Sequence, residues 1–261
     1  MLGHHEQARQ LAEDTLTRSR QVLGANYPDT LRSAIYLAAI LRELGHYEQA
    51  RQLGEDTLTR QRRVLGDDHP DTLRSAHSLA LTLSKLGHYE QARQLGEDTL
   101  NRCRRALGDD HPYTLLSASI LAVTLPESGQ YERARQLGED TLNRCRQVLG
   151  ADHFDTLRSA IYLAATLREL GQYEQARQLG EDTLNRCRRV LGDDHSYTLR
   201  SASILAATLR ELGHYEQARQ LGEDTLTRQR RVLGDDHPDT LRSITILAAV
   251  RASLGVHDRA R

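Results

Sequence analysis

The chain has 261 residues, of which 38% are hydrophobic and 27% charged, a balance typical of globular proteins. Its 35 basic and 36 acidic side chains give a net charge of -1, so no excess of positive charge attracts a nucleic-acid backbone, and no nucleic-acid partner is predicted. The sequence contains neither a run of 18 apolar residues nor a basic leader before an apolar stretch, which predicts a cytoplasmic protein with no membrane partner.

The sequence is built on a period of 42 residues. Glycines recur at that spacing from Gly3 to Gly255, and residues 45–75 are identical to residues 213–243. Such a period is the signature of a repeat architecture. We therefore interpret 1–261 as a single array, with repeats at 3–44, 45–86, 87–128, 129–170, 171–212 and 213–254 and a partial repeat at 255–261.

Each repeat is predicted to contain two helices, which we name helix B and helix A. The chain opens with a helix B at 3–23. Residues 47–66 place apolar and small side chains on one side at steps of three and four, which predicts the next helix B. Residues 71–87 continue this pattern as a helix A that ends at Gly87, where a left-handed residue is favoured. The chain closes with a helix A at 239–254.

A single pair of such helices cannot bury both of its faces, so successive repeats are expected to stack and share a core. Gly54 and its equivalents lie inside helix B, where glycine costs roughly 1 kcal/mol relative to alanine. We expect the close approach of a neighbouring helix backbone to offset this cost, and we attribute Ala12 in the first repeat to the lack of a preceding repeat. Pro126 is predicted to end or kink the third helix A early and to bend the solenoid locally.

One pattern in the repeat resembles the tetratricopeptide repeat. It is L-A-x-x-L-x-x-x-G-x-Y-x-x-A, given by Leu37, Ala38, Leu41, Gly45, Tyr47 and Ala50. The long period is similar to the variety found in kinesin light chains and bacterial signalling proteins. The resemblance implies an all-α fold, a right-handed superhelical solenoid of six 42-residue helix-turn-helix repeats. It also implies a non-enzymatic scaffold that binds a peptide or protein on the concave helix-A surface, within a larger bacterial signalling protein.

Related long-repeat modules hold a bound peptide with an asparagine on helix A, and no repeat of this chain has one at that position. The family's usual backbone clamp is therefore not expected. By resemblance, the partner-binding residues are those that line the inner surface: Arg32, Ile35, Tyr36, Arg74, His77, Arg158, Ile161, Tyr162, Arg200 and Arg242. Guanidinium groups suit carboxylates, which favours an acidic partner. Alternatively, Glu43, Glu169 and Glu211 pair with neighbouring arginines and leave a wall of mixed charge.

The loop "GDDHPDT" at 66–72 contains the residue types of a metal or acid/base site. Its second acidic position, Asp68, varies only to Asn26, a change that a helix N-cap tolerates. The other supposed ligands do not persist, since Tyr27 replaces the histidine and Tyr113 replaces the last aspartate. We therefore interpret the loop as a turn with a helix cap, and predict no metal, cofactor or catalytic residue. A divalent-ion site is the alternative.

Three cysteines, Cys103, Cys145 and Cys187, occupy one position of the repeat that holds serine or glutamine elsewhere. These polar replacements predict a partly exposed position. An odd number of cysteines without C-x-x-C spacing predicts free thiols.

The two ends of the chain are complementary halves of one helical hairpin. No helix A precedes the first helix B, and only 255–261 follows the last helix A. We therefore expect a head-to-tail contact, in which the last helix A of one copy packs on the first helix B of the next. The alternative function is then a structural module that stacks into a continuous superhelix. The incomplete ends are also compatible with a segment of a larger protein.

Overall fold

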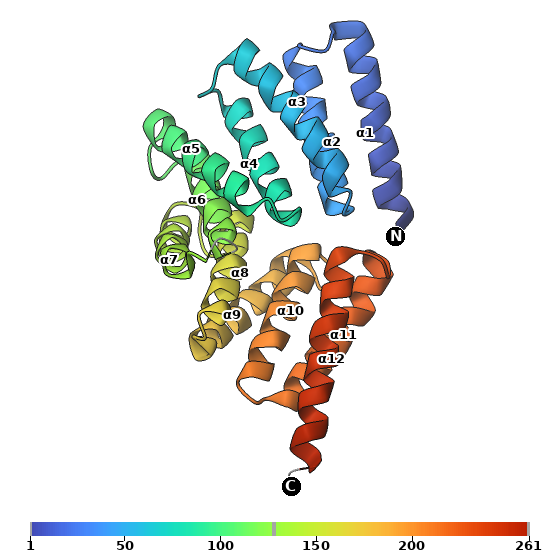
Figure 1. Cartoon of the computed structure of the whole chain (residues 1–261), viewed down its shortest axis with the longest axis vertical. Helices are drawn as coiled ribbons and strands as arrows, with labels where there is room; N and C mark the ends of the chain where they lie inside the picture. The colour runs from blue at the N-terminus through green and yellow to red at the C-terminus, as the bar shows by residue number, and fades with distance from the viewer. Residues whose placement is uncertain (1, 127–128, 260–261) are drawn as a thin grey trace. The chain divides into compact units, whose positions relative to one another are not determined.

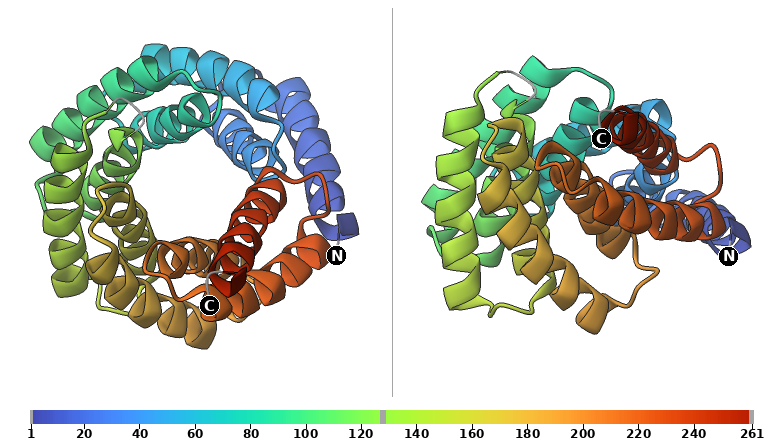
Figure 2. Two further views of the ribbon diagram at one scale, coloured as in Figure 1. Left: turned by 60° about the horizontal axis from the view of Figure 1, so that its bottom comes forward. Right: turned by 90° about the horizontal axis from the view of Figure 1, so that it is seen from below.

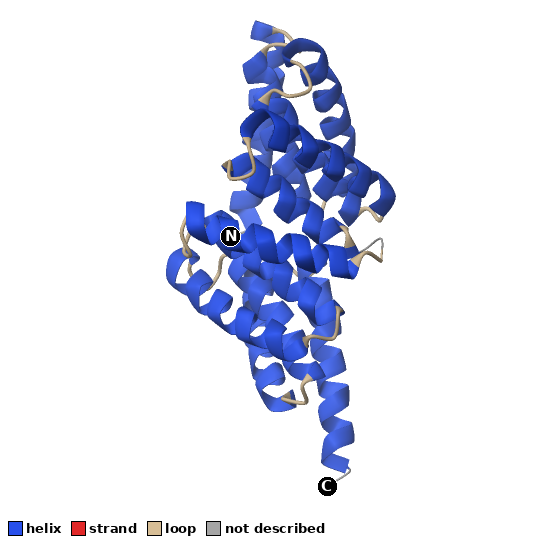
Figure 3. Cartoon of the chain, turned by 90° about the vertical axis from the view of Figure 1, so that its left-hand side faces the viewer, coloured by secondary structure: helices blue, strands red, loops and turns tan. Residues whose placement is uncertain are grey.

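The computed structural model describes residues 2–126 and 129–259, which form twelve α-helices and contain no β-strand (Figure 1, Figure 3). The helices are α1 (Leu2–Leu23), α2 (Pro28–Glu43), α3 (Tyr47–Leu65), α4 (Pro70–Lys85), α5 (Tyr89–Leu107), α6 (Pro112–Thr124), α7 (Tyr131–Val148), α8 (Phe154–Glu169), α9 (Tyr173–Leu191), α10 (Ser196–Glu211), α11 (Tyr215–Val232) and α12 (Pro238–Arg259). Odd-numbered helices are the predicted helices B, and even-numbered helices are the predicted helices A.

The chain divides into two compact units. The first, Met1–Gln130, contains α1 to α6, and the second, Tyr131–Arg261, contains α7 to α12. Within each unit, every helix packs on the next, and consecutive helices A also pack on one another, as α2 does on α4 and α10 on α12. Consecutive helices B make no comparable contact among the described residues. Each unit therefore curves toward its helices A, which line the inner side (Figure 2). The predicted all-α solenoid of paired helices is confirmed.

The core of each unit is shared between repeats, because helices A such as α2, α4, α8 and α10 each pack between two helices B. One cluster joins α3, α4 and α5, and its buried members are Leu58, Ala76, Leu79, Leu83 and Ala92. The second unit contains a cluster of the same positions across α7, α8 and α9. As expected for a chain with so few aromatic residues, leucine and alanine fill these positions in every repeat but the last, which has Ile244 and Arg251 at two of them.

A glycine in the left-handed region ends helix A, as the sequence predicts. Gly87 has a φ of 81°, its N–H bonds to the carbonyl of Ser84 at 3.1 Å, and the N–H of His88 bonds to that of Leu83 at 2.9 Å. This pair of bonds satisfies carbonyls that the end of a helix leaves free. Side chains other than hydrogen are strained at such a φ, so the turn requires glycine.

The glycine inside helix B is accommodated by a leucine side chain and not by a neighbouring backbone, contrary to our expectation. A Cβ added at Gly54 would lie 3.4 Å from Cδ1 of Leu79, which belongs to helix A of the same repeat. Ala12 packs against the equivalent cluster around Leu37. The lack of a preceding repeat therefore does not explain Ala12, because the relevant neighbour follows it in the chain.

Pro126 coincides with an early end of α6, which stops at Thr124, whereas α4 continues to Lys85, one residue beyond Ser84, the equivalent of Pro126. The early end is confirmed, since proline lacks the N–H that would continue the helix. The closing turn keeps its bonds, from Gly129 N to Pro126 O at 2.9 Å and from Gln130 N to Leu125 O at 3.1 Å. A local bend of the solenoid stays a prediction.

The last helix differs from the sequence prediction. We expected helix A to end at Leu254 and a partial repeat to follow, but α12 continues through Gly255 to Arg259. Residues 260–261 lie outside the described part of the chain. After Gly87 or Gly213 a helix B docks on the preceding helix A and stabilises the turn, and no such helix follows Gly255 within the described residues. No helix in the described ranges is long and apolar enough to cross a membrane.

Candidate partner-binding wall and inter-repeat joints

The histidine of the "GDDHPDT" loop caps helix A. In α4, Nδ1 of His69 accepts a hydrogen bond from the backbone N–H of Asp71 at 3.2 Å. The equivalent histidines cap α6, α8, α10 and α12 in the same way. In α2 the capping residue is Tyr27, which makes no side-chain cap bond. The predicted N-cap at the second acidic position is therefore wrong, and the cap is one residue further on.

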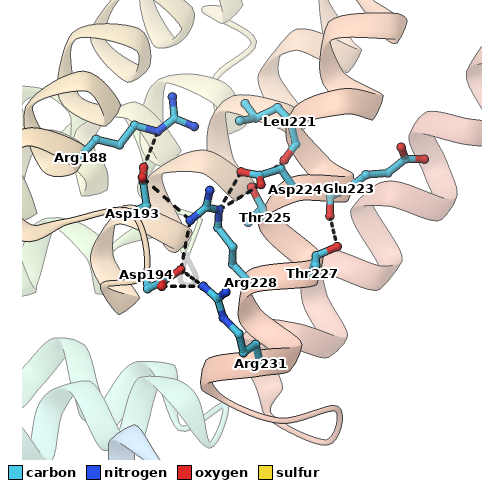
Figure 4. Close-up of polar contacts among 10 residues, drawn as sticks. All are labelled: Arg188, Asp193, Asp194, Leu221, Glu223, Asp224, Thr225, Thr227, Arg228 and Arg231. Carbon is cyan, nitrogen blue, oxygen red and sulfur yellow. Dashed lines mark hydrogen bonds and ion pairs between the residues drawn. The ribbon is translucent and has the colours of Figure 1, made fainter. Parts of the chain in front are cut away.

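The second acidic residue instead binds the next repeat. Nη1 of Arg102 on α5 lies 3.1 Å from Asp68, and its Nε lies 2.9 Å from Asp98 on the same helix. In the second unit, Arg228 makes the same two contacts, and a further arginine, Arg231, lies 2.6 Å from the loop carboxylate (Figure 4). We name this bridge between the loop of one repeat and helix B of the next the loop clamp.

The loop clamp explains why asparagine alone replaces the second acid. Nη1 of Arg60 donates to Oδ1 of Asn26 at 3.0 Å, so an amide oxygen serves as well as a carboxylate. At Asp152 a hydrogen bond from Arg186 lowers the pKa of the carboxyl below its usual value, and Arg189 adds to this effect, while desolvation opposes it. Among the described residues, no three His, Cys, Asp or Glu side chains are grouped as a metal site. The loop acts as a joint between repeats.

Four of the ten predicted binding residues are buried. They are Ile35, His77, Ile161 and Tyr162. His77 on α4 hydrogen-bonds with Ser117 on α6, and Tyr162 on α8 lies under Arg200 on α10, whose guanidinium is 5.2 Å from the ring centroid. Because consecutive helices A within a unit pack on one another along this stripe, these side chains are not part of the accessible inner surface, and the expectation for them is corrected.

The other six members of the set form what we name the helix-A wall, taken separately in each unit. The exposed ones are Arg32, Tyr36 and Arg242, and the half-buried ones are Arg74, Arg158 and Arg200. Three of its arginines already have a carboxylate nearby: Arg74 lies 3.2 Å from Asp71, Arg158 lies 2.8 Å from Asp155, and Arg32 lies 3.4 Å from Asp29. Arg74 also stacks over Tyr36, at 5.4 Å from the ring centroid. Pairing of this kind gives the wall mixed charge.

A second row of arginines on the inner side is also paired. Arg42 lies 3.0 Å from Glu43 and donates to Ser78 of the next helix A at 3.1 Å. Arg168 and Arg210 pair with the glutamates that follow them. The alternative interpretation of a mixed-charge wall therefore describes this row.

Sequence reasoning missed an aromatic group at the N-terminal ends of α8 and α10. The rings of Phe154 and Tyr197 are 5.0 Å apart and nearly perpendicular, and Arg158 lies 5.6 Å from the centroid of Phe154. We name these three residues the aromatic shelf. Phe154 takes a position that holds proline in most repeats, and Tyr197 one that holds aspartate. The sequence did contain a signal for this group. Phe154 is the first residue of α8 and Tyr197 the second of α10, and because these two helices pack side by side, aromatic residues at such positions are expected to meet.

The three cysteines are fully buried, which corrects the prediction of a partly exposed position. Burial raises the pKa of Cys187 to about 11, and burial, followed by the charge of Asp155, does the same for Cys145. Cys103 accepts a hydrogen bond from Ser117 at 3.2 Å. Gln61 and Gln229 at the same position are also buried, so polar character at this position does not indicate exposure.

The family follows from these repeats and from comparison with known proteins. A family model of the tetratricopeptide repeat matches residues 1–63, 37–105, 127–186 and 155–231. The chain belongs to the tetratricopeptide repeat family. A search of curated protein sequences gave no match.

Solved structures show the same fold as this tetratricopeptide repeat chain. A putative kinesin light chain from Podosopora anserina, with nearly identical repeats, is 28% identical, covers 78% of this chain and 97% of its own, and has a TM-score of 0.59. BtubC from P. vanneervenii is 16% identical, with 90% and 94% covered and a TM-score of 0.63. NprR, solved in complex with its cognate peptide NprX, is 16% identical, with 95% and 68% covered and a TM-score of 0.68. At such identities the last two are similar in fold alone.

Proposed function

We propose that this tetratricopeptide repeat chain is a non-enzymatic scaffold that binds a peptide or protein segment along its inner surface, in the cytoplasm and within a larger bacterial signalling protein. The aromatic shelf carries the proposal. Phe154 is 36% exposed although it lies among aromatic and arginine side chains, and in the first unit Tyr36 is 54% exposed beside Arg74. Tyrosine and arginine are among the side chains that most often dominate the free energy of protein binding.

Two further observations support this function. The structure of NprR, similar in fold, contains a bound peptide. In this chain the shelf and Tyr36 lie on helices A, which line the inner side of each unit. An extended segment placed there would contact several repeats at once, which gives a repeat scaffold both area and specificity.

An acidic partner is part of this proposal, and it rests on two arginines. Arg32 is exposed and lies 3.4 Å from Asp29 and 3.7 Å from Asp71, longer than direct hydrogen bonds. Arg242 is exposed and makes no ion pair within the described ranges. A ligand carboxylate would meet an unpaired guanidinium at Arg242 and would compete only with longer ion pairs at Arg32, whereas at Arg74 it would have to displace a closer aspartate.

The test is selection from a random dodecapeptide library displayed on phage, followed by titration of the selected peptides against the full chain. Truncating Phe154 or Tyr36 to alanine should weaken binding about tenfold or more, because each removes an exposed anchor. Val190→Ala is the matched control, since Val190 is 44% exposed on a helix B. Failure to select any peptide, or selected peptides whose binding ignores Phe154 and Tyr36, would contradict the proposal.

A second candidate function is structural, with copies of the chain stacked end to end into a continuous superhelix. It is favoured by the exposure of α1 and α12 at positions that internal repeats bury. Leu241 on α12 is 49% exposed, whereas Leu199 at the same position of α10 is 2% exposed.

A further inference from the structure

The outer face of α1 exposes a stripe that internal repeats bury. It consists of Ala8, Leu11 and Thr15, spaced so that they lie on one side of the helix. Leu11 is 70% exposed, whereas its equivalents Leu53 and Leu221 pack against the core of the preceding helix A. Ala8 and Thr15 are exposed, whereas the equivalent alanines and threonines of α3, α5, α9 and α11 are at most 2% exposed. This face is shaped to receive a helix A.

The free face of α12 is the other half of the same joint. Leu241, Thr245 and Ala248 are exposed, whereas the residues equivalent to them in α2, α4, α8 and α10 are buried. In those helices, the face packs on the next helix B and the next helix A. The stripe on α1 and the face of α12 therefore reproduce, across two copies, the joint that each unit repeats internally.

One half of a loop clamp lies unused near each end of the chain, an arginine on α1 and an acidic residue in the loop before α12. Its arginine on α1 is Arg18, the equivalent of Arg60 and Arg228, and its last loop acid is Asp236, the equivalent of Asp194. Arg18 and Asp236 are both exposed, and neither makes an ion pair within the described ranges. Stacking α12 of one copy on α1 of another would bring these opposite charges together in the arrangement that Figure 4 shows for Arg228 and Asp194.

One residue departs from the template. Arg251 stands where α2, α4, α8 and α10 have a leucine that packs on the next helix B, as Leu41 does in the cluster with Ala50 and Leu53. It is 62% exposed and lies 2.9 Å from Glu223. An arginine in an otherwise apolar contact weakens it, because the charged group must give up water.

We infer that the chain associates head to tail with a second copy of itself, α12 packing on α1 in the register of the internal joints, with Arg18 and Asp236 completing a loop clamp between copies and Arg251 keeping the contact weak and reversible. The inference rests on the second candidate function and is independent of peptide binding by the helix-A wall. Each contact is heterologous, so further copies can add to either end.

Sedimentation of the full chain, from micromolar to near-millimolar concentration, tests the register. Arg251→Leu restores the internal pattern and should tighten association about tenfold or more, since an apolar side chain replaces an exposed ion. Arg251 is exposed, so this substitution leaves the fold intact, which circular dichroism verifies. If the unsubstituted chain and R251L both stay monomeric, the inference and the second candidate function are overturned together.

Charge reversal tests the clamp. Arg18→Asp alone and Asp236→Arg alone should each weaken the association of the R251L chain about tenfold, because each places like charges together, and the double reversal should restore it. The matched control combines Asp236→Arg with Arg63→Asp, which has the same net charge but alters an exposed arginine outside the joint. Association that persists but ignores both Arg251→Leu and the charge reversals would overturn this register and leave self-assembly standing.

Discussion

Replacing Gly180 by alanine should stabilise the chain. Gly180 lies inside α9, where glycine costs roughly 1 kcal/mol relative to alanine because the unfolded chain is more flexible there. An added Cβ would lie 3.4 Å from Cδ1 of Leu205, an ordinary van der Waals distance, so no atom has to move. The first repeat already holds Ala12 at this position. We therefore expect most of the difference, about 0.5–1 kcal/mol, to be recovered.

Gly138 provides a matched control within the same unit. Residues 134–146 and 176–188 are identical in sequence, so the helix propensity of the two sites is the same. A Cβ at Gly138 would lie 3.1 Å from Cδ1 of Leu163, closer than normal contacts, and the leucine would have to shift. Such overpacking offsets the gain in propensity. Gly138→Ala should therefore stabilise less than Gly180→Ala.

Thermal and urea unfolding, followed by circular dichroism, measure the difference. A repeat array need not unfold in one step, so the two variants are compared by their midpoints in the same conditions. For a chain of this size 1 kcal/mol corresponds to roughly 2–4 °C, so Gly180→Ala should raise the midpoint by about 1–4 °C. If Gly138→Ala raises it as much or more, the leucine contact does not decide the outcome and the argument fails.

Three further predictions concern the helix caps and a buried thiol. Tyr27→Asn supplies the side-chain cap that α2 lacks and should stabilise the chain by roughly 0.5–2 kcal/mol, whereas His69→Ala removes a cap and should cost a similar amount, both read from thermal unfolding. Cys187 is buried and its pKa is raised to about 11, so a disulfide reagent at pH 8 should label it slowly in the folded chain and rapidly in denaturant. Rapid labelling of the folded chain would contradict its burial.

The repeat architecture could be predicted because each feature occurs several times. A helix end at Gly45 or Gly87 is determined by the residues of the turn itself, since the turn requires a left-handed backbone conformation that glycine adopts readily. The same glycine recurs in successive repeats, so the sequence supports this prediction several times. The early end of α6 before Pro126 is local for the same reason. The continuation of α12 through Gly255 depends instead on whether a following helix B is long enough to dock, which the turn residue alone does not determine.

The inner surface was predicted less well, because exposure there depends on packing between successive helices A. Tyr36 and Tyr162 occupy one position of the repeat, yet the first is 54% exposed and the second 3%. Arginines stack over both rings, so the stacking does not separate them. The exposure of each ring therefore depends on the other side chains that surround it. A prediction that treats equivalent positions of all repeats as equal cannot distinguish the exposed Tyr36 from the buried Tyr162.

The loop shows a different limit, because two chemical roles tolerate the same substitutions. Asn26 in place of Asp68 is compatible with a helix cap, and it is equally compatible with accepting a hydrogen bond from an arginine of the next repeat. Only the geometry assigns the cap to His69 and the acid to the clamp.

In a chain this repetitive, the invariant and the variable positions have different tasks. The loop clamp recurs at joint after joint, so it fixes the spacing of repeats and cannot distinguish one partner from another. Phe154 and Tyr197 each depart from the repeat where the helix A ends meet, and Arg251 departs where an internal joint would place leucine. Each departure replaces a side chain whose structural task the other repeats define. Because such a replacement gives up a contact that stabilises the other repeats, it points to a separate role: partner binding at the aromatic shelf and control of stacking at Arg251.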